Sequence, residues 1–268
     1  MTKLDKKYNF LRPIKNNNLG RVGRSEDGGY VVDTSVLKKF DNLISFGLGS
    51  DWSFELDFIK KKINAKVHVY DHTTDIFIYI KPLIKCFKRF ITYRKKYKDL
   101  SERFLQLINY VSFINLKNVL FFREKITYPI KIKKKESDIE KAFSRISPQI
   151  NLILKIDIEG SEYEIIDEII KYSERIEMLI LEFHSLDEKE ESFTSSIKKL
   201  QNKFDIIHVH GNNHCAKSLS GLPIAIEVTL LSKKYTPEKI EYICDFPLKD
   251  LDFPNNSLKK DLFFSFEN

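Results

Sequence analysis

Short apolar runs alternate along the chain with longer polar stretches in which apolar residues recur at helical spacing. The runs predict strands at residues 42–47, 66–70, 118–122, 151–158, 177–183, 205–209 and 224–231. The stretches between them predict helices at residues 53–62, 74–90, 100–114, 137–145, 161–172 and 189–203. The first five runs are rich in Val, Ile, Leu and Phe with little alternation, as is typical of parallel strands buried on both faces. The pattern therefore predicts an α/β fold with a doubly wound, mostly parallel, seven-stranded sheet.

The two ends of the chain depart from this regular rhythm. Residues 211–223 contain Gly, Asn, Ser and Pro without a helical pattern, so the last two strands are expected to pair antiparallel across a long loop. Near the N-terminus, Asp27-Gly28-Gly29-Tyr30 combines a turn signal with a strand-like continuation, which predicts a hairpin that caps the sheet. We therefore divide the chain into an N-terminal cap (1–40), a core domain (41–235) and a C-terminal extension (236–268) without an assigned role.

The composition is that of a globular domain with a positive charge. The 268 residues are 42% hydrophobic, which allows a sizeable core. Lys and Arg number 45 against 38 Asp and Glu, and the resulting net charge of +7 attracts anionic partners without choosing among them. No apolar run approaches the ~18 residues of a membrane-spanning helix. Because the first residues also lack the apolar run of a secretory signal, we expect a cytoplasmic protein.

Residues 81–98 are strongly basic and also carry Phe87, Phe90, Tyr93 and Tyr97. Such a stretch can lie on a membrane surface or along a nucleic acid. The interpretation that we favour is a helix with one buried aromatic stripe and one solvated basic face. We therefore expect no nucleic-acid partner and at most a peripheral membrane contact through this segment. The sequence leaves the oligomeric state open.

A glycine turn, Gly47-Leu48-Gly49, follows the first predicted strand. Such a turn lets the backbone pass close to a ligand at the carboxyl ends of the strands. The second predicted strand runs into Asp71, about twenty positions after the glycines, where the ribose-binding carboxylate of a nucleotide-binding sheet lies. The alternative for Asp71 is a helix N-cap or turn residue. We prefer ribose binding because position and context agree.

The glycine turn also bears on which adenosine cofactor is bound. A dinucleotide-binding turn has a third glycine that lets a helix pack beside the pyrophosphate, and Trp52 holds that position here. S-adenosylmethionine has no phosphate, and its zwitterionic amino-acid end can be bound by backbone N–H groups and by the side chains of Ser50, Asp51 and Ser53. The sequence therefore favours S-adenosylmethionine over a nicotinamide cofactor.

Three charged residues, Lys155, Asp157 and Glu159, alternate at the end of the fourth predicted strand. A period of two places them on one face. Charges in a buried strand are costly unless they are paired or functional, and the alternative here is an internal pair of Lys155 with a carboxylate. Because ligands of open α/β sheets bind at the carboxyl ends of strands, we expect Asp157 and Glu159 to be functional.

The segment Lys155-Ile156-Asp157-Ile158-Glu159-Gly160-Ser161-Glu162-Tyr163 resembles the signature of the FkbM-type methyltransferase family. Residues 21–32, 45–54, 181–184 and 208–213 resemble parts of one branch of that family, in the right order, although the glycine turn departs from the commoner Gly-Ala-Asn-x-Gly form. The resemblance runs from about residue 21 to 232. It implies the Rossmann-like class I methyltransferase fold and transfer of a methyl group from S-adenosylmethionine to a hydroxyl oxygen.

The resemblance also implies an acceptor among small molecules and sugars. We expect methylation of a capsule or lipopolysaccharide sugar during surface polysaccharide biosynthesis, with a nucleotide sugar or a polysaccharide as the acceptor.

Transfer to a sugar hydroxyl needs a general base, because the hydroxyl is a weak acid. The candidates near the strand ends are His184, His210, Asp157 and Glu159. We rank the two histidines first, since histidine is the usual base near neutral pH, and expect Asp157 to position the cofactor or substrate. The residues assigned to the substrate are Tyr30, Asn212 and Asn213, although asparagines in a loop often serve only the turn.

Other possibilities remain beside this prediction. His208, His210 and His214 invite a metal interpretation, in which His210 joins Asp157 and Glu182 around a divalent ion that acidifies the hydroxyl. We favour a site without metal. A nicotinamide-dependent sugar-nucleotide oxidoreductase or epimerase would use the same sheet, and a non-catalytic adenosyl-binding protein would bind the cofactor without turnover.

Overall fold

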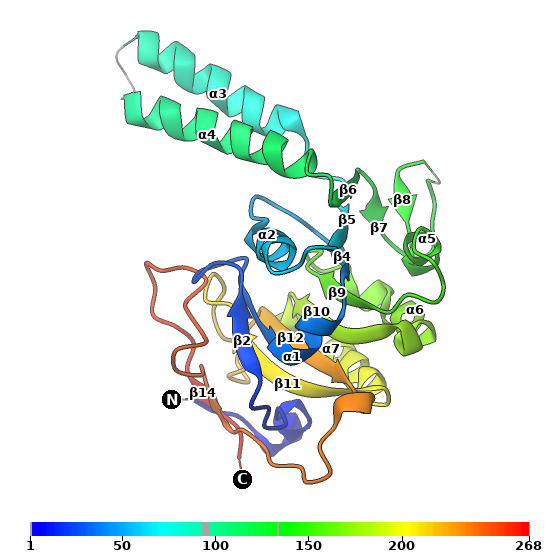
Figure 1. Ribbon diagram of the computed structural model, residues 1–268. Helices are drawn as coiled ribbons and strands as arrows, with labels where there is room; N and C mark the ends of the chain where they lie inside the picture. Colours follow the sequence, from blue (N-terminus) through cyan, green and yellow to red (C-terminus); the bar gives the residue numbers. More distant parts are fainter. Residues whose placement is uncertain (1, 93–96, 133, 268) are drawn as a thin grey trace.

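The computed structural model describes residues 2–92, 97–132 and 134–267. Its centre is a seven-stranded sheet in the order β11-β12-β10-β9-β4-β5-β6 (Figure 1). The strands are β4 (Asn42–Phe46), β5 (Lys66–Tyr70), β6 (Val119–Phe122), β9 (Leu152–Ile156), β10 (Ile176–Phe183), β11 (Phe204–Gly211) and β12 (Ile226–Ser232). All neighbouring pairs are parallel except the two that involve β12. The predicted doubly wound sheet with an antiparallel last pair is confirmed.

The strands form where the apolar runs lie because helices cover both faces of the sheet. Every residue of β9 and of β10 is buried, as expected for strands without a solvated face. One core cluster contains residues of α5 (Ile139–Ser144), α6 (Ile166–Lys171) and α7 (Leu186–Leu200). The opposite cluster contains residues of α1 (Thr34–Lys39) and α2 (Ser53–Lys60). The core therefore consists of two apolar layers separated by the sheet.

The fourth predicted strand is shorter than expected. β9 ends at Ile156, and the chain then turns through Glu159, whose φ is +54°. Lys155 therefore lies within the strand, whereas Asp157 and Glu159 lie in the turn that follows it. The side chain of Glu159 is 85% exposed, so the expected placement of all three charges on one strand face is wrong.

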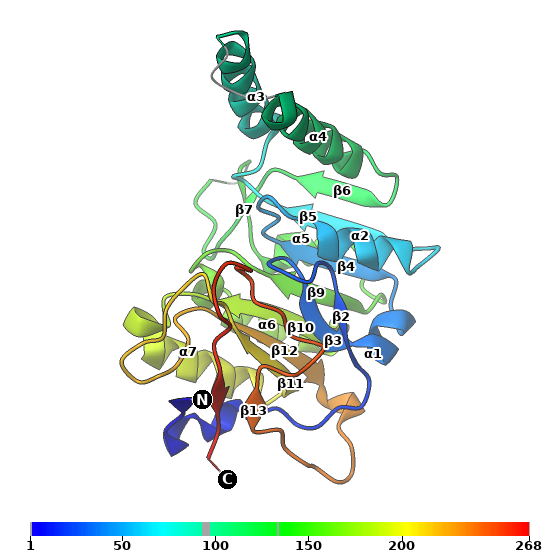
Figure 2. The same ribbon diagram turned by 90° about the vertical axis from the view of Figure 1, so that its left-hand side faces the viewer.

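The crossover between β5 and β6 is a helical hairpin of α3 (Ile76–Ile91) and α4 (Tyr97–Ile114). It projects from the body instead of lying flat on the sheet (Figures 1 and 2). The expected buried aromatic stripe is therefore wrong at two positions, since Phe87 is 51% and Tyr97 is 73% exposed. Tyr93, which also belongs to the predicted stripe, lies outside the described residues. No helix in the described ranges is long and apolar enough to cross a membrane.

The two ends of the chain meet beside the β11 end of the sheet (Figure 2). The N-terminal cap contains β1 (Thr2–Lys3), a 3₁₀ helix (Lys6–Leu11) and the predicted hairpin, formed by β2 (Leu19–Val22) and β3 (Tyr30–Asp33). In the C-terminal extension, β13 (Asp245–Phe246) and β14 (Phe264–Ser265) form a small sheet with β1, in the order β1-β14-β13. The cap and the extension are thus joined by backbone pairing. The proposed domain boundaries themselves stay a prediction.

The remaining short elements complete the connections. β7 (Lys125–Ile126) pairs in parallel with β8 (Glu136–Ser137) after β6. Single 3₁₀ turns are found at Glu162–Glu164, Ser173–Arg175 and Lys233–Tyr235.

Candidate functional site

The carboxyl ends of β4, β5 and β9 enclose a cavity of about 190 Å³. Gly47 and Gly49 follow β4, Asp71 follows β5 and Asp157 follows β9, and all four line this cavity, which we call the strand-end pocket. Parallel neighbours end at the same edge of a sheet, and the topology therefore brings these distant segments together.

Asp71 fastens the glycine turn to the end of β5. Its Oδ2 accepts hydrogen bonds from the backbone N–H groups of Leu48, at 2.9 Å, and Gly49, at 3.0 Å. Its Oδ1 accepts hydrogen bonds from the N–H and the hydroxyl of Thr73, both at 2.7 Å. Burial raises the pKa of Asp71, but these hydrogen bonds outweigh burial and lower the pKa to about 2. Both oxygens are engaged within the protein, so ribose binding stays a prediction that requires one of them to share its bonds.

The two glycines of the turn serve different purposes. A Cβ atom at Gly47 would lie 1.6 Å from the carbonyl oxygen of Asp157, so only glycine lets the ends of β4 and β9 approach. A Cβ at Gly49 would meet no atom within 4 Å, although its φ is +58°. Gly49 therefore faces open space in the strand-end pocket, where a ligand can approach the backbone.

The strand-end pocket has an acidic lining. Its carboxylates belong to Asp71, Glu124, Asp157 and Glu159, and Lys125 supplies the one cation among the lysines and arginines that line it. Ile126 and Ile158 provide apolar walls. This lining suits a ligand that combines a positively charged part with a flat apolar part, and it disfavours a ligand with several negative charges.

Several pocket residues were missed by the sequence analysis, namely His72, Thr73, Glu124, Lys125, Ile126 and Ser161. Most of them directly follow the second and third strands of the predicted sheet. Their position directly after a predicted strand could have indicated a role in the site. Because they belong to no recognisable motif, the sequence did not distinguish them from ordinary loop residues.

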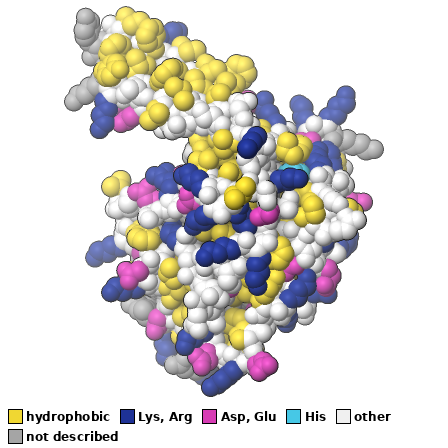
Figure 3. Space-filling model, viewed as in Figure 1, with side chains coloured by type: hydrophobic (Ala, Val, Ile, Leu, Met, Phe, Trp, Pro, Cys, Tyr) yellow, Lys and Arg dark blue, Asp and Glu magenta, His cyan; other side chains and the backbone are white. Residues whose placement is uncertain are grey.

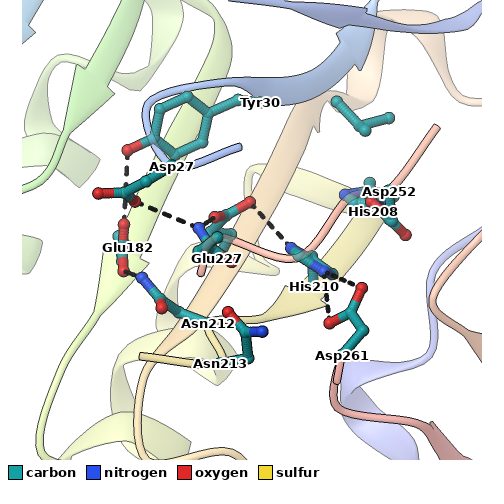
Figure 4. Close-up of polar contacts among 12 residues, drawn as sticks. Asp27, Tyr30, Glu182, His208, His210, Asn212, Asn213, Glu227, Asp252 and Asp261 are labelled. Carbon is teal, nitrogen blue, oxygen red and sulfur yellow. Dashed lines mark hydrogen bonds and ion pairs between the residues drawn. The ribbon is translucent and has the colours of Figure 1, made fainter. Parts of the chain in front are cut away.

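A second polar group lies beside the strand-end pocket and shares Asp157 with it. The hydroxyl of Tyr30 donates to Asp157 Oδ2 at 3.2 Å, and Glu182 Oε2, at 3.4 Å, is an alternative acceptor. Asn212 donates to Glu182 Oε1 at 2.7 Å (Figure 4). His184 Nε2 lies 3.8 Å from Asp157 and 3.6 Å from Glu182. We call Tyr30, Asp157, Glu182, His184 and Asn212 the acidic cluster.

The orientation of His184 is set by Glu162, whose carboxylate is buried. Glu162 Oε1 accepts hydrogen bonds from the backbone N–H of His184 and from its Nδ1, both at 2.8 Å. The ring therefore carries a proton on Nδ1 and presents Nε2 to the acidic cluster and to Glu159, 3.5 Å away. Burial lowers the pKa of His184, but Glu162 and the carboxylate of Glu182 outweigh burial and raise it to about 9. His184 is thus a cation at neutral pH.

The two carboxylates of the acidic cluster hold their protons more tightly than free carboxylates do. Burial raises the pKa of Asp157, although Lys155 and His184 work in the other direction. Burial, together with Asp157 and Glu227, raises the pKa of Glu182 much further. Asp157 therefore combines contact with the strand-end pocket with a proton affinity shifted toward neutral pH, as a general base requires.

One set of side chains in the described ranges is arranged as a metal site would be. The ligand atoms of Asp157, Glu182 and His184 lie within 4.8 Å of one another. A carboxylate bonded to the far nitrogen of the histidine, as Glu162 is here, is a common support for a metal ligand. The structure thus places His184, and not the predicted His210, beside Asp157 and Glu182.

His210 is buried in a network of charged side chains (Figure 4), and it does not line the strand-end pocket. Its Nε2 is 3.2 Å from both oxygens of Asp261, and its Nδ1 is 3.5 Å from Glu227. Burial lowers the pKa of His210, but the hydrogen bonds to Asp261 and the nearby carboxylate of Glu227 outweigh burial and raise it to about 10. Its side chain is 1% exposed. The structure thus separates His210 from the other candidate bases.

The C-terminal extension supplies partners to polar groups of β11 and of the loop after it. Asp252 lies 3.0 Å from His208, and Asp261 binds His210. The amide of Asn213 donates to the carbonyls of Asn256, Lys259 and Lys260. Asn213 therefore fastens the extension, whereas Asn212 reaches the acidic cluster.

Ser50, Asp51 and Ser53 lie on the other side of the glycine turn. They line a separate hollow of about 490 Å³ beside Trp52, and none of them lines the strand-end pocket. Asp51 accepts a hydrogen bond from the Ser53 N–H at 2.8 Å and pairs with Arg24 at 2.9 Å. A larger hollow of about 550 Å³ lies between the hairpin helices. Neither hollow contains the strand ends that position Asp71 and Asp157.

No protein-family model matches the sequence, and no curated protein matches it. Several solved structures are similar to part of this chain, at low TM-scores. A precorrin-6y C5,15-methyltransferase from Geobacter metallireducens GS-15 is 11% identical, with a TM-score of 0.37 over 74% of this chain and 87% of that chain. A putative rRNA-methylase from Clostridium thermocellum is 12% identical, with a TM-score of 0.39 over 74% and 92%. A fibrillarin pre-rRNA processing protein from Methanococcus jannaschii is 8% identical, with a TM-score of 0.38 over 74% and 68%.

Because each of these TM-scores lies below 0.5 and each identity is 12% or lower, the likenesses support no conclusion about the activity or the substrate of this chain. The mostly parallel seven-stranded sheet, in which β12 is antiparallel to both neighbours, has the strand arrangement that the sequence analysis expected of a Rossmann-like class I methyltransferase fold.

Proposed function

We propose that the chain is an S-adenosylmethionine-dependent O-methyltransferase that binds its cofactor in the strand-end pocket. The observation that carries the proposal is the acidic lining of that pocket next to the open backbone of Gly49. Of its four carboxylates, Glu124 is already paired with Arg145, so Asp71, Asp157 and Glu159 supply the negative charge that remains for a ligand. S-adenosylmethionine, when bound, supplies an electrophilic methyl group on a positively charged sulfur. Carboxylates around the pocket stabilise such a cation, and Ile126 and Ile158 offer apolar contacts to the adenine.

The same lining is unfavourable for a nicotinamide dinucleotide. A pyrophosphate carries two negative charges and requires cations or a helix N-terminus with free N–H groups. The N–H groups of Leu48 and Gly49 are already bonded to Asp71. Trp52 stacks on Phe113, with 5.6 Å between the ring centroids, where the dinucleotide pattern has a glycine. These contacts favour the methyltransferase over the oxidoreductase.

The acidic cluster is the proposed site for the acceptor hydroxyl. Carboxylates and an asparagine amide can hold several hydroxyl groups of a sugar by hydrogen bonds, whereas an anionic group at the same place would be repelled. We assign Asp157 as the proton acceptor, because it alone belongs to both the strand-end pocket and the acidic cluster. His184 stabilises the ionised form of Asp157 through its positive charge, and Glu162 keeps the ring in place.

The acceptor that we propose is a sugar of a surface polysaccharide, either as a nucleotide sugar or in the polymer. The resemblance to FkbM-type methyltransferases supports a small-molecule or sugar hydroxyl, and the acidic cluster supports a neutral polyhydroxyl group at the point of transfer. For a nucleotide sugar, the diphosphate would have to lie outside the acidic cluster.

The proposal is tested by incubating the full chain with methyl-labelled S-adenosylmethionine and a panel of nucleotide sugars and oligosaccharides. Label is expected in at least one sugar, with loss of turnover in Asp157→Asn and retained turnover in a control variant of the distant surface, Lys117→Gln. A chelator arm is included, and we expect no effect because His184 already supplies a cation to the carboxylates. Cofactor binding without label transfer to any acceptor would instead support a non-catalytic adenosyl-binding protein.

A further inference from the structure

The α3–α4 hairpin presents an apolar surface that the rest of the chain does not cover (Figure 3). Cys86 is the one buried residue among the sixteen of α3. The exposed large apolar residues include Phe77, Ile84, Phe87, Ile91, Tyr97, Phe104, Leu105 and Ile108. Contiguous exposed apolar surface of this kind marks a contact site for another body.

The apolar residues of the two helices share one face. Along α3, Phe77, Ile84, Phe87 and Ile91 are separated by seven, three and four positions, so they fall on one side of the helix. A groove of about 380 Å³ joins this side to α4. The groove is lined mainly by Leu83, Ile84 and Phe87 from α3 and Tyr97, Leu100 and Phe104 from α4. The hairpin thus has one continuous apolar face.

Positive charge lies on α3 beside this face. By helical spacing, Lys81 and Lys88 flank the apolar residues, whereas Lys85 and Arg89 lie farther round the helix, in a hollow that also contains Asp99 and Glu102 of α4. α3 contains Lys81, Lys85, Lys88 and Arg89 and no acidic residue, and all four cations are exposed. None of the four forms an ion pair with another residue in the part of the chain that the structure describes. In the sequence, residues 81–98 carry eight Lys and Arg and no Asp or Glu. Of these, residues 93–96 lie outside the described residues.

We propose that the α3–α4 hairpin binds the surface of an anionic lipid bilayer. The apolar face enters the boundary between headgroups and acyl chains, and the lysines beside it contact anionic headgroups. Because the apolar stripe runs along the whole of α3, the helix lies in the plane of the interface. This proposal goes beyond the methyltransferase activity and does not depend on it.

The charges beside the apolar face favour a bilayer over a second copy of the chain as the partner that covers this face. A symmetric dimer through this face would bring two copies of the flanking cations Lys81 and Lys88 toward each other, and the apolar groove itself contains no acidic residue to pair them. An anionic bilayer satisfies the apolar face and the cations together, so it is the occupant that the charges favour.

The end of the hairpin nearest the sheet packs against the rest of the protein. Tyr79 of α3 stacks on Tyr110 of α4 with 4.7 Å between ring centroids, and both rings contact Trp52 in the turn before α2. At the end farther from the sheet, Phe90 of α3 contacts Tyr97 of α4, with 6.5 Å between ring centroids. Binding of the hairpin to a bilayer would therefore also fix the orientation of the rest of the protein relative to the bilayer.

The test is sedimentation of the full chain with vesicles of phosphatidylcholine alone and with about one third phosphatidylglycerol. We expect at least about tenfold stronger partitioning onto the anionic vesicles, weakened by raising NaCl from ~0.1 M to ~0.5 M. Phe87→Gln with Phe104→Gln should reduce partitioning at least about tenfold, and Lys81→Gln with Lys88→Gln should reduce it about tenfold on anionic vesicles only.

Matched variants away from the hairpin serve as controls. Ile63→Gln with Leu258→Gln removes two apolar residues that are more exposed than Phe87 and Phe104, and Lys249→Gln with Lys260→Gln removes two exposed cations. Both controls should bind as the unmodified chain does. All substituted positions are exposed, and circular dichroism with thermal melting checks that each variant is folded.

Two results would overturn the proposal. One is equal or absent partitioning onto neutral and anionic vesicles. The other is a dimer, measured by light scattering without lipid, that Phe87→Gln with Phe104→Gln dissociates while no vesicle binding is seen. The second result would assign the apolar face to self-association.

Discussion

Lys155 of β9 forms a buried ion pair with Glu55 of α2, with 3.3 Å between Nζ and Oε1. Their side chains are 4% and 0% exposed. Burial lowers the pKa of Lys155, but Glu55 and Asp157 outweigh burial and raise it, so the lysine remains charged. The lysine of the motif at residues 155–163 thus holds α2 against the sheet, and the neighbouring Asp157 is left to face the strand-end pocket.

This pair predicts a large, non-additive effect on stability. Lys155→Met leaves the carboxylate of Glu55 buried without a cation, and we expect the free energy of unfolding to fall by about 3–5 kcal/mol. Adding Glu55→Gln removes the orphaned charge and should recover most of the loss. Urea unfolding of both single variants and the double variant measures this. Additive losses in the double variant would show that the two residues are not coupled.

His210 is predicted to stabilise the protein without taking part in catalysis. Its pKa of about 10 lies above the unfolded value of ~6.5. A group whose pKa is raised on folding contributes stability that is complete below the unfolded pKa and is lost as pH rises through the folded pKa. The difference in unfolding free energy between the unmodified chain and His210→Gln should therefore shrink between about pH 6.5 and pH 10.

Measured turnover of a His210 variant distinguishes a structural role of this residue from a catalytic one. His210→Gln should keep kcat/KM within about twofold at temperatures well below melting, because the residue is sealed between Asp261 and Glu227. A loss of a hundredfold or more, the usual effect of removing a general base, would restore His210 as the base.

The acidic cluster predicts a bell-shaped dependence of kcat/KM on pH. At low pH, activity should fall because Asp157 gains a proton, and burial places that step above the usual range of an aspartate pKa. At high pH, activity should fall near pH 9 because His184 loses its positive charge. Asp157→Asn should reduce turnover by about 10²–10⁴-fold.

His184→Gln provides the matched test of the alkaline limb. The variant should be less active near neutral pH and should lose the decline near pH 9, while the acid limb remains. A decline near pH 9 that persists in His184→Gln would mean that another group produces it.

The glycine turn offers a pair of neighbouring substitutions with different outcomes. Gly47→Ala should lower the melting temperature strongly or prevent folding, because its Cβ would lie 1.6 Å from the Asp157 carbonyl. Gly49→Ala meets no atom and should cost only about 1–2 kcal/mol of backbone strain at φ +58°. We expect it to weaken binding of S-adenosylhomocysteine about tenfold. Unchanged affinity in Gly49→Ala would place the ligand elsewhere.

Much of the sheet could be predicted from the sequence because its signal is local. Strands buried on both faces must be apolar throughout, and β4, β5 and β10 begin and end within about one residue of the apolar runs. The terminal sheet could not be predicted. β1, β13 and β14 are two residues long, and Thr2 pairs with Phe264 from the opposite end of the chain.

The site was less predictable, since its chemistry depends on partners that are distant in sequence. His184 and His210 are similar as sequence signals, each near the end of an apolar run. Glu162 turns His184 toward the acidic cluster, whereas Asp261, in the C-terminal extension, encloses His210. For Asp71, the hydrogen bonds agree with the alternative of a turn residue: Oδ2 accepts from the glycine turn, and Oδ1 accepts from Thr73 and Thr74, which follow it in the chain.

The central claim is that the strand-end pocket binds S-adenosylmethionine, and isothermal titration calorimetry with this cofactor and with NAD tests it most directly. We predict one site with a Kd on the order of micromolar for S-adenosylmethionine, weakened by Glu159→Gln, and no heat with NAD at the same concentrations. Binding of NAD, or the same affinity for S-adenosylmethionine in Glu159→Gln and Gly49→Ala as in the unmodified chain, would contradict it.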